Sequence, residues 1–402
     1  MKVCFVTANY PPEALGGTEQ VVTALARELS VFGVDLFVIS GSDRPYTGTN
    51  VEDEIHEGLL VHRVVSQCDE HDANGFVRPR LLRSVRELLL RHRPDVVHVH
   101  AFSRLGAGIT PICRELGIRV AVTFHDLWTT CARYFRVPHG GVQCPSGTDR
   151  TPCLTCVNDA LQTDPEIVAL GLRERDRVLR AEVALANVAT APSATAAAFV
   201  RECLPYAGPI EVIPHGLLRP VPAEHLAPRH VVGGAVRVGT FGGLVRVKGV
   251  RDLVAAVAGL PCELHLSGPF HEPGFEDEIR ALAAANGTRL VARGRWDGSG
   301  RHPARDLHLA VFPSHCQETY GLVVDEALAH GVPTVVSDQG ALRERAGSGG
   351  VVVTSLAQLA TVLRELVTSA DRLAALGAAI PATLPTIAAS AARHLELYRR
   401  LR

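Results

Sequence analysis

Residues 313–333 have the sequence PSHCQETYGLVVDEALAHGVP. The apolar run before them predicts a β-strand ending at Ser314, and the stretch from about Gly321 to about His330 predicts a helix. Glu318 then lies in the turn and Glu326 in the first turns of the helix. Because helix N-terminal amides favour anions, a phosphate bound there would lie between two carboxylates. Such a pair suits the hydroxyl groups on either side of a nucleotide-sugar diphosphate, whereas an isolated pair would only be solvated helix charges.

The same strand–turn–helix pattern recurs along the whole chain of 402 residues. Alternating β-branched runs and helix-length segments are typical of βα units on a parallel sheet. The proline-rich stretch 215–235 predicts a linker between two such series. We therefore expect an α/β fold of two doubly wound, Rossmann-like domains facing each other across a cleft, residues 1–214 and 236–380. A C-terminal helix within 381–402 is expected to pack back toward the first domain.

The composition restricts the classes of function. With 41 basic and 42 acidic residues, the net charge of −1 argues against bulk electrostatic affinity for nucleic acid. A hydrophobic fraction of 47% and a charged fraction of 21% exclude wholesale disorder. The longest uncharged stretch is a poor membrane span, and the first apolar run is too short for a secretory signal. We therefore expect a cytoplasmic protein.

Two turns of the first domain carry residues suited to ligand binding. The glycines Gly16 and Gly17 let the backbone approach a ligand just before a helix, which suits either an anion site or an ordinary loop. His125 follows a predicted strand, where it would either bind a sugar hydroxyl or phosphate or serve a structural role. His98 and His100 on the neighbouring strand are expected in the core or behind His125.

The first turn of the second domain is the other phosphate candidate. Gly242 and Gly243 are followed by Arg246 and Lys248, and two glycines with two cations suit a diphosphate. The turn is not a P-loop, since no Lys-Ser/Thr follows at the required spacing. The chain also lacks the G-x-G-x-x-G pattern of nicotinamide oxidoreductases at its first turn.

The segment around the two glutamates resembles the signature of glycosyltransferase family 4, whose members are retaining enzymes of the GT-B fold. Glu318 and Glu326 are separated by seven residues within a matching P-S-x-x-x-E-x-x-G-L-x-x-x-E-A-x-A-x-G-x-P context. The other elements of the family occur in the expected order: Gly16-Gly17, His125-Asp126, Ile213-Pro214-His215-Gly216 and the glycine-rich loop with Lys248. The resemblance therefore spans nearly the whole chain.

The resemblance implies a role for each of these residues. Glu318 would hold hydroxyls of the transferred sugar and Glu326 the ribose, while Lys248, helped by Arg246, would bind the diphosphate. The implied catalytic residues are His125, Lys248 and Glu318. The implied donor-binding residues are Gly16, Gly17, Gly242, Gly243, Arg246, Lys248, Glu318, Tyr320, Gly321, Leu322, Val323 and Glu326.

The implied function is transfer of a sugar, with retention, from a UDP- or GDP-sugar to a hydroxyl of a small-molecule, glycan or lipid-linked acceptor. Such enzymes need no metal ion for chemistry. The chain departs from the family at Gly243, where many members have Arg, at His215, where Asn is commoner, and at Tyr320, where Phe is common. The alternatives are a nucleotide-sugar epimerase, a catalytically silent relative, or a zinc-stapled binding protein without enzymatic activity.

Four cysteines lie in a predicted insert at residues 129–157: Cys131, Cys144, Cys153 and Cys156. One C-x-x-C pair with two further cysteines can close a tetrahedral structural zinc site. Free thiols or a redox pair are the alternatives.

Residues 79–92 predict a basic amphipathic helix. Its arginines stand opposite a stripe of leucine and valine: Arg80, Arg83, Arg86 and Arg91. The simpler interpretation is a core-packed helix with a solvated arginine face. The other is peripheral contact with a membrane surface or an anionic acceptor.

Overall fold

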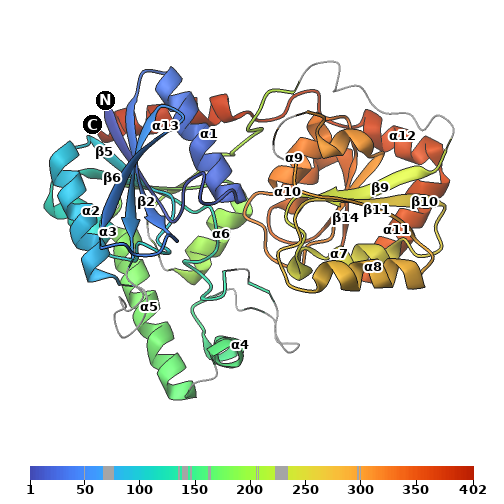
Figure 1. The fold of residues 1–402 in the computed structure, drawn as a ribbon, viewed down its shortest axis with the longest axis horizontal. Coiled ribbons are helices and arrows are strands. Elements are labelled where there is room, and N and C mark those ends of the chain that lie inside the picture. The colour runs from blue at the N-terminus through green and yellow to red at the C-terminus, as the bar shows by residue number, and fades with distance from the viewer. Residues whose placement is uncertain are drawn as a thin grey trace. The chain divides into compact units, whose positions relative to one another are not determined.

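The computed structural model describes residues 1–48, 50–66, 77–134, 136–137, 144, 147–161, 164–204, 206, 208–221, 234–296, 298 and 300–402. It divides into two compact units, Met1–Leu218 with Pro385–Arg402, and Arg219–Leu384. Each unit is a mainly parallel sheet with helices packed against it, so the predicted α/β fold class is confirmed (Figure 1). Most of the predicted linker, residues 222–233, lies outside the described residues.

The sheet of the first unit has eight strands in the order β3-β4-β2-β1-β5-β6-β7-β8. They are β1 (Lys2–Thr7), β2 (Asp35–Ser42), β3 (Val51–His56), β4 (Leu59–Val65), β5 (Val96–Val99), β6 (Arg119–Thr123), β7 (Val188–Ala191) and β8 (Ile210–Val212). Only the edge pair β3–β4 is antiparallel among these strands. The sequence analysis missed β3 because its VEDEIH sequence is rich in acidic residues, which are depleted in strands.

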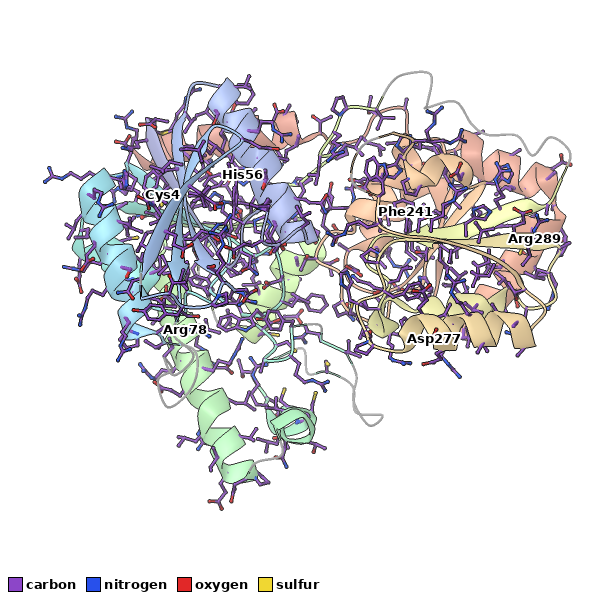
Figure 2. The ribbon with its side chains drawn as sticks, viewed as in Figure 1. Cys4, His56, Arg78, Phe241, Asp277 and Arg289 are labelled. Atoms are coloured by element: carbon purple, nitrogen blue, oxygen red, sulfur yellow. The ribbon has the colours of Figure 1, made fainter. Side chains whose placement is uncertain are left out.

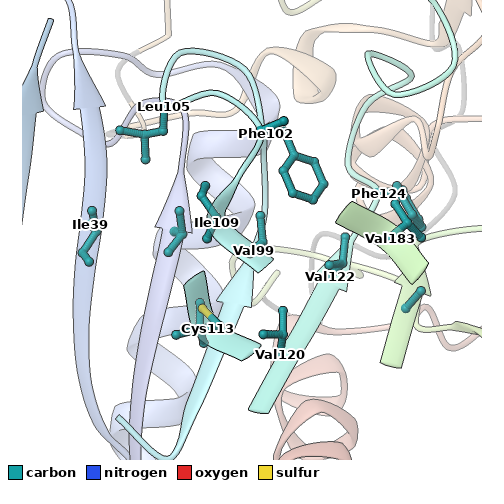
Figure 3. Packing of buried hydrophobic residues seen from close by; sticks show 14 of the residues in the cluster. Ile39, Val99, Phe102, Leu105, Ile109, Cys113, Val120, Val122, Phe124 and Val183 are labelled. Atoms are coloured by element: carbon teal, nitrogen blue, oxygen red, sulfur yellow. The ribbon is translucent and has the colours of Figure 1, made fainter. Parts of the chain in front are cut away.

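Helices cover both faces of this sheet. The helices of this unit are α1 (Gly17–Val31), α2 (Pro79–His92), α3 (Ile109–Glu115), α4 (Thr151–Leu161), α5 (Pro165–Leu185), α6 (Ala194–Cys203) and α13 (Ile387–Leu401). Of these, α4 packs against α5. Cys4 and Val6 of β1 join a core cluster with α2, α3, α5 and α6, part of which Figure 3 shows. Val3 and Phe5 point to the opposite face and join α1 and α13. This alternation follows from the two-residue period of a strand.

The helix predicted at residues 79–92 is α2. Leu81, Val85, Leu88 and Leu89 are buried in the core, as for an ordinary amphipathic helix. Its arginines are exposed or half-buried, and Arg86 forms an ion pair with Glu115 of α3. Among the helices described, none combines the length and the apolar character that crossing a membrane requires.

The last helix completes the core of the first unit. Although α13 and α1 lie at opposite ends of the chain, they pack side by side (Figure 1). Leu397 and Tyr398 of α13 are buried with Val22 and Leu25 of α1. The Tyr398 hydroxyl also lies 2.5 Å from Nδ1 of His98 on β5.

Leu397→Ala is expected to lower the free energy of unfolding of the first unit by about 2–5 kcal/mol, because it opens a cavity at a site with 1% exposure. Urea denaturation followed by tryptophan fluorescence measures this change. The neighbouring Glu396 is exposed, so Glu396→Ala serves as the control and should change little. Equal stability of the two variants would contradict the burial of α13.

Four of the buried histidines of the first unit have strongly lowered pKa values. His98 belongs to β5, His100 follows β5, His125 follows β6, and His394 lies on α13. Burial lowers the pKa of His125 to about 3 and that of His394 to about 4, and it holds the pKa values of the other two well below the usual range. All four rings are therefore neutral at physiological pH.

These rings make stability depend on pH. As pH falls below the ordinary histidine pKa of 6.5, the unfolded chain binds protons that the folded rings do not accept, down to a pH of about 3 for His125. Each such ring then costs about 1.4 kcal/mol of stability per pH unit. Denaturation at pH 7, 6 and 5 should show a smaller loss for His394→Phe than for wild type. The exposed His271 provides the control, since His271→Gln should leave the dependence of unfolding free energy on pH unchanged. The same pH dependence in His394→Phe as in wild type would contradict the conclusion that buried His394 stays neutral.

The sheet of the second unit has six strands in the order β11-β10-β9-β12-β13-β14. They are β9 (Val236–Phe241), β10 (Cys262–Ser267), β11 (Arg289–Arg293), β12 (Leu309–Phe312), β13 (Thr334–Ser337) and β14 (Gly350–Val353), and all pairs are parallel. The strand order reverses between β9 and β12, which is where doubly wound sheets bind ligands. The two turns singled out in the sequence follow these two strands.

Helices also cover both faces of this sheet. They are α7 (Val250–Ala256), α8 (Phe275–Ala285), α9 (Leu322–Ala329), α10 (Leu342–Ala346), α11 (Leu356–Thr368) and α12 (Ala370–Ala378), with short 3-10 turns at η2 (Arg246–Lys248), η3 (Pro303–Asp306) and η4 (Gly347–Gly349). One core cluster joins the sheet to α7, α8, α11 and α12, and another joins it to α9 and α10.

Candidate functional site

A lysine and a glutamate meet where β9 and β12 end in the second unit. Nζ of Lys248, at the end of η2, donates to Oε1 of Glu318 in the turn after β12. The Ser314 hydroxyl donates to the same oxygen over 2.9 Å, and the Cys316 thiol lies 3.5 Å from it. The Lys248 side chain is 38% exposed and that of Glu318 is 19% exposed, so both can be reached from solvent.

The pairing decides the charge of Lys248. Burial lowers the pKa of the Lys248 ammonium, but the adjacent Glu318 carboxylate outweighs this effect and the net shift is upward. The side chain therefore stays positively charged at neutral pH. Among the described residues, the side-chain donors to Glu318 all go to Oε1, which leaves Oε2 to accept a hydroxyl group.

The turn after Glu318 ends in a helix N-terminus. Gly321 precedes α9 with φ of 91°, in the left-handed region that favours glycine. A Cβ at this position would come within 2.9 Å of Leu342, so a side chain would also clash. Because glycine has no side chain to cap the helix, the amides of Leu322 and Val323 are the first of α9 and can bind an anion.

The turn is held by an aspartate that the sequence analysis did not single out. Asp325 is fully buried and accepts a hydrogen bond of 2.7 Å from the Tyr320 hydroxyl and one of 2.9 Å from Nε of Arg345. The Arg345 guanidinium also lies over the Tyr320 ring, 4.7 Å from its centre. Tyr320 is 3% exposed and its hydroxyl supports the turn from within, while the donor contact expected of it stays a prediction.

A second support approaches Glu318 from the loop after β13. The Ala341 amide donates to the Glu318 carbonyl over 2.8 Å. A Cβ at Gly340 would overlap the backbone of Glu318, so only glycine permits this contact. The fixed backbone on both sides of Glu318 makes its carboxylate a preorganised group.

Glu326 lies on α9, and its Oε2 is 3.7 Å from Nε2 of His302. Nδ1 of His302 accepts a hydrogen bond of 3.1 Å from the Ala304 amide, so Nε2 carries a proton and faces the carboxylate. The ring of Phe241, at the last position of β9 (Figure 2), lies edge-on to His302, and His330 stacks on it. The Glu326 side chain remains 30% exposed.

The glycines after β9 lie beside α9. A Cβ at Gly242 would lie 3.3 Å from the Val323 side chain, which places the start of α9 against this turn. A Cβ at Gly243 would meet only the His271 ring, at 3.7 Å, so a side chain has room there.

The Arg246 side chain pairs with two glutamates of its own unit. Its guanidinium forms ion pairs with Glu272 at 3.1 Å and with Glu278 of α8 at 2.6 Å. It also lies over the ring of Phe275. The structure thus engages Arg246 with two carboxylates, and the diphosphate contact expected from the sequence stays a prediction.

In the first unit, Gly16 precedes α1 and Gly17 begins it. The Glu19 carboxylate folds back over this helix start: burial raises the pKa of Glu19, and hydrogen bonds from the Gly16 and Glu19 amides counteract the rise. The anion at this helix N-terminus is therefore the side chain of Glu19 itself.

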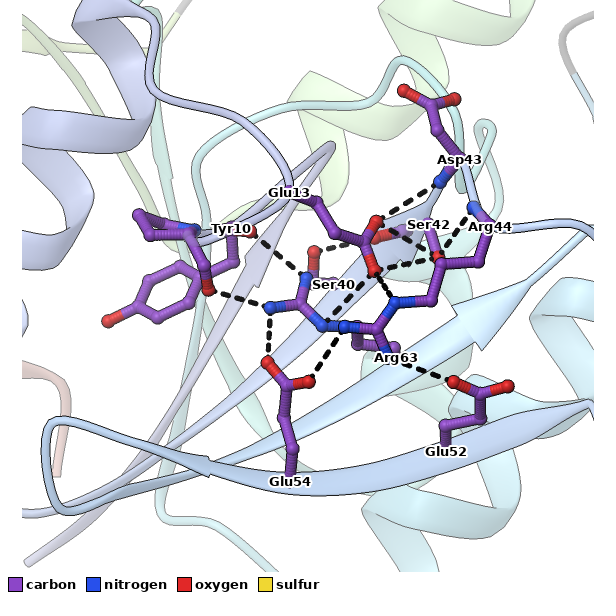
Figure 4. Close-up of polar contacts among 11 residues, drawn as sticks. Tyr10, Glu13, Ser40, Ser42, Asp43, Arg44, Glu52, Glu54 and Arg63 are labelled. Atoms are coloured by element: carbon purple, nitrogen blue, oxygen red, sulfur yellow. Dashed lines mark hydrogen bonds and ion pairs between the residues drawn. The ribbon is translucent and has the colours of Figure 1, made fainter.

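The loop that leads to Gly16 is tied down by a buried arginine (Figure 4). Arg63 of β4 is fully buried and donates to the carbonyls of Tyr10, over 3.0 Å, and Pro11, over 2.6 Å. Its guanidinium also pairs with Glu54 of β3 and, at 3.3 Å, with Glu13 of the same loop. These contacts fix the backbone that precedes α1.

His125 lies among other histidines, with 6% exposure. Its Nε2 is 2.8 Å from Nδ1 of His100, and its Nδ1 is 3.3 Å from Nε2 of His215. The rings of His125 and His215 are stacked, with centres 4.9 Å apart. Both ring nitrogens of His125 thus have histidine partners.

The structure does not support the structural zinc hypothesis. Cys131, Cys144, Cys153 and Cys156 are half-buried free thiols. In the part of the chain that is described, no three His, Cys, Asp or Glu side chains are arranged to hold a metal ion. Arg133 instead donates to the Cys156 sulfur over 3.3 Å, and burial raises the pKa of Cys144 to about 11. C-x-x-C spacing places Cys153 and Cys156 on one face of α4 but does not dictate the distance to the other two.

Two family models match the chain. Residues 15–217 match the model described as glycosyltransferase family 4, and residues 235–369 match the one described as glycosyl transferases group 1. The GDP-mannose-dependent α-mannosyltransferase of Mycolicibacterium smegmatis is 32% identical over 127 residues. This match covers 31% of the present chain and 32% of that relative, about a third of each.

Solved structures share the fold over the full length. HepE of Anabaena, in complex with UDP, has a TM-score of 0.67 at 18% identity and covers 100% of both chains. An α,α-trehalose-phosphate synthase (UDP-forming) from Burkholderia xenovorans, in complex with glucose-6-phosphate, has a TM-score of 0.67 at 12% identity, covering 99% of this chain and 100% of that one. These likenesses identify the fold, and the match over residues 15–217 takes in half of the chain. The protein therefore belongs to glycosyltransferase family 4 and has the GT-B fold.

Proposed function

We propose that this protein transfers a sugar, with retention of configuration, from a nucleotide-diphosphate sugar to a hydroxyl group of an acceptor. The observation that carries the proposal is the pair of Lys248 and Glu318 beside the N-terminus of α9. A cation, helix amides and a carboxylate there suit the diphosphate and the sugar of one donor molecule.

Each part of the donor has a partner in this proposal. Lys248 and the amides of Leu322 and Val323 offset the charge of the diphosphate. Oε2 of Glu318 accepts a hydroxyl of the sugar, while Glu326 accepts the hydroxyls of the ribose. The family resemblance implies catalysis without a metal ion, and the charge on the leaving group is then stabilised by these protein groups.

The proposed chemistry is front-side attack. The bond between the sugar C1 and the phosphate oxygen breaks, while a bond forms between C1 and the acceptor oxygen on the same face. The released phosphate oxygen takes the proton of the acceptor hydroxyl. Lys248 assists because charge accumulates on the diphosphate in the transition state.

The donor base is proposed to be uracil or guanine. HepE was crystallised with UDP, and the mannosyltransferase relative is named for GDP-mannose. The proposed acceptor is a hydroxyl of a small molecule, a glycan or a lipid-linked sugar. The peripheral membrane contact through residues 79–92 and the cytoplasmic location stay predictions.

A thermal-shift panel of UDP-, GDP-, ADP- and TDP-sugars tests donor binding. One nucleotide is expected to stabilise the wild type, by about 2.7 kcal/mol at a concentration of 100 times its Kd. Glu326→Ala should lose this stabilisation because the ribose loses its carboxylate, while the exposed Glu344→Ala should keep it. A shift without release of nucleotide in the presence of acceptors would instead indicate a catalytically silent relative, and no shift with any donor would contradict the proposal.

Lys248→Ala and Glu318→Ala are expected to lower kcat for nucleotide release by about 10²–10³-fold, the effect of removing one electrostatic contact to a transition state. Arg251→Ala is the matched control, since Arg251 is an exposed cation that pairs with Glu278 of α8. Near-normal turnover in both the Lys248 and the Glu318 variant would show that these two residues do not take part in the reaction.

Gly243→Arg is expected to strengthen donor binding. The position has room for a side chain, and the nearby Arg246 is engaged by two glutamates. A new cation beside the diphosphate should lower the donor Kd roughly fivefold, since a half-exposed ion pair contributes about 1 kcal/mol. Titration calorimetry measures the change, with Gly243→Gln as an uncharged control of similar length. Weaker binding by the arginine variant would place the diphosphate away from this turn.

A further inference from the structure

Three histidines of the first unit form a hydrogen-bonded chain. His100 after β5, His125 after β6 and His215 after β8 follow three separate strands of the sheet. Nδ1 of His100 is 2.8 Å from Nε2 of His125, and Nδ1 of His125 is 3.3 Å from Nε2 of His215. The three rings are between 2% and 6% exposed. The chain is therefore mostly buried, and His125 is its most exposed ring at 6%.

The direction of the hydrogen bonds follows from an accounting of protons. A neutral histidine carries one N–H donor and one acceptor nitrogen, so a ring that accepts a hydrogen bond at one nitrogen donates at the other. Nε2 of His100 has no hydrogen-bond partner among the described residues. Buried N–H groups without an acceptor are rarer in proteins than buried acceptors without a donor. The proton of His100 is therefore on Nδ1 and is donated to His125.

The accounting then fixes the tautomer of His125. Because its Nε2 accepts from His100, its own proton must be on Nδ1, where it is donated to His215. We propose that His100 sets this tautomer so that His125 presents an Nδ1–H donor to a hydroxyl oxygen of the bound substrate, and that His215 accepts this hydrogen bond before the substrate binds. The inference rests on the proposed transferase function and assigns His125 the role of hydrogen-bond donor, which excludes it as a general base through Nδ1.

The surroundings keep the chain uncharged. The titratable groups around His125 are mostly further histidines and a tyrosine, from β5 and the residue after it, α13 and the segment after β8: His98, His100, His215, His394 and Tyr398. Burial, together with a smaller effect of the neighbouring His394, lowers the pKa of His125 to about 3. A doubly protonated ring, which would offer donors on both nitrogens, is therefore not populated at neutral pH.

His215 completes this arrangement, since it supplies the ring that stacks on His125. The contact of 3.3 Å is the longer of the two bonds to His125, so it is the one that a substrate oxygen can replace. His100 and His215 are thus positioning residues that act through His125.

The test is the protonation state of the His125 ring in the full-length protein labelled with 15N-histidine. Long-range proton–nitrogen spectra distinguish protonated from unprotonated ring nitrogens, and the loss of signals in His125→Gln assigns the residue. The proposal predicts a proton on Nδ1 and no titration between pH 5 and 8, without any ligand added. A proton on Nε2, or a transition near pH 6.5, would overturn it.

Two variants of His100 separate tautomer control from packing. His100→Asn places an amide donor near the position of Nδ1 and should keep the tautomer and the turnover. His100→Leu removes the donor and leaves space for water, which donates or accepts equally well, so both tautomers should appear. Its kcat should then fall on the order of tenfold, with donor KM little changed. Unchanged spectra and turnover in His100→Leu would contradict the proposal.

Failure of the histidine inference can be distinguished from failure of the proposed function. The spectra are recorded without substrate, whereas the thermal-shift panel reports donor binding in the second unit. A donor-induced shift with the wrong tautomer would overturn the histidine inference alone. The expected tautomer without any donor-induced shift would overturn the transferase proposal.

Discussion

The shared oxygen of Glu318 is the contact on which the candidate site depends. Lys248 and Ser314 both donate to it, and they reach it from the ends of β9 and β12, where the strand order reverses. A nucleotide diphosphate needs positive charge where its leaving oxygen develops charge, and a free carboxylate oxygen beside it suits a sugar hydroxyl. The pairing keeps Lys248 charged and holds Glu318 in place, so that one ion pair prepares both functions before a donor arrives.

The surrounding structure restricts how this pair can move. Asp325 joins Tyr320 to Arg345 beneath the turn, while Gly340 and Ala341 approach the Glu318 backbone from the loop after β13. Preorganisation of this kind lowers the reorganisation that a polar site must undergo during a reaction. Polar groups of the first unit are also held in place before a ligand binds. Arg63 fixes the loop before α1, and the buried histidines hydrogen-bond to one another.

The sequence predicts the parts of this protein that follow from periodicity and local spacing. Alternating apolar runs predicted most strands of both sheets, and the E-x7-E segment predicted the turn and the helix that hold Glu318 and Glu326. The strands β3 and β14 were missed because one is acidic and the other is four residues long at the sheet edge. Partners that depend on side-chain direction were missed as well: spacing gives no sign that Arg246 turns to Glu278 or that Tyr320 turns to Asp325. The cysteine spacing suggested a metal site, but spacing along the chain does not specify the distances between the side chains of an insert.

The central claim is that the second unit binds a nucleotide diphosphate between Lys248, the start of α9 and Glu326. A crystal structure of the protein soaked with UDP, and in parallel with GDP, tests it most directly. The account predicts the ribose hydroxyls on the Glu326 carboxylate, and the diphosphate on the Leu322 and Val323 amides and the Lys248 ammonium. A nucleotide bound away from these groups, or no bound nucleotide at millimolar concentration of either, would contradict it.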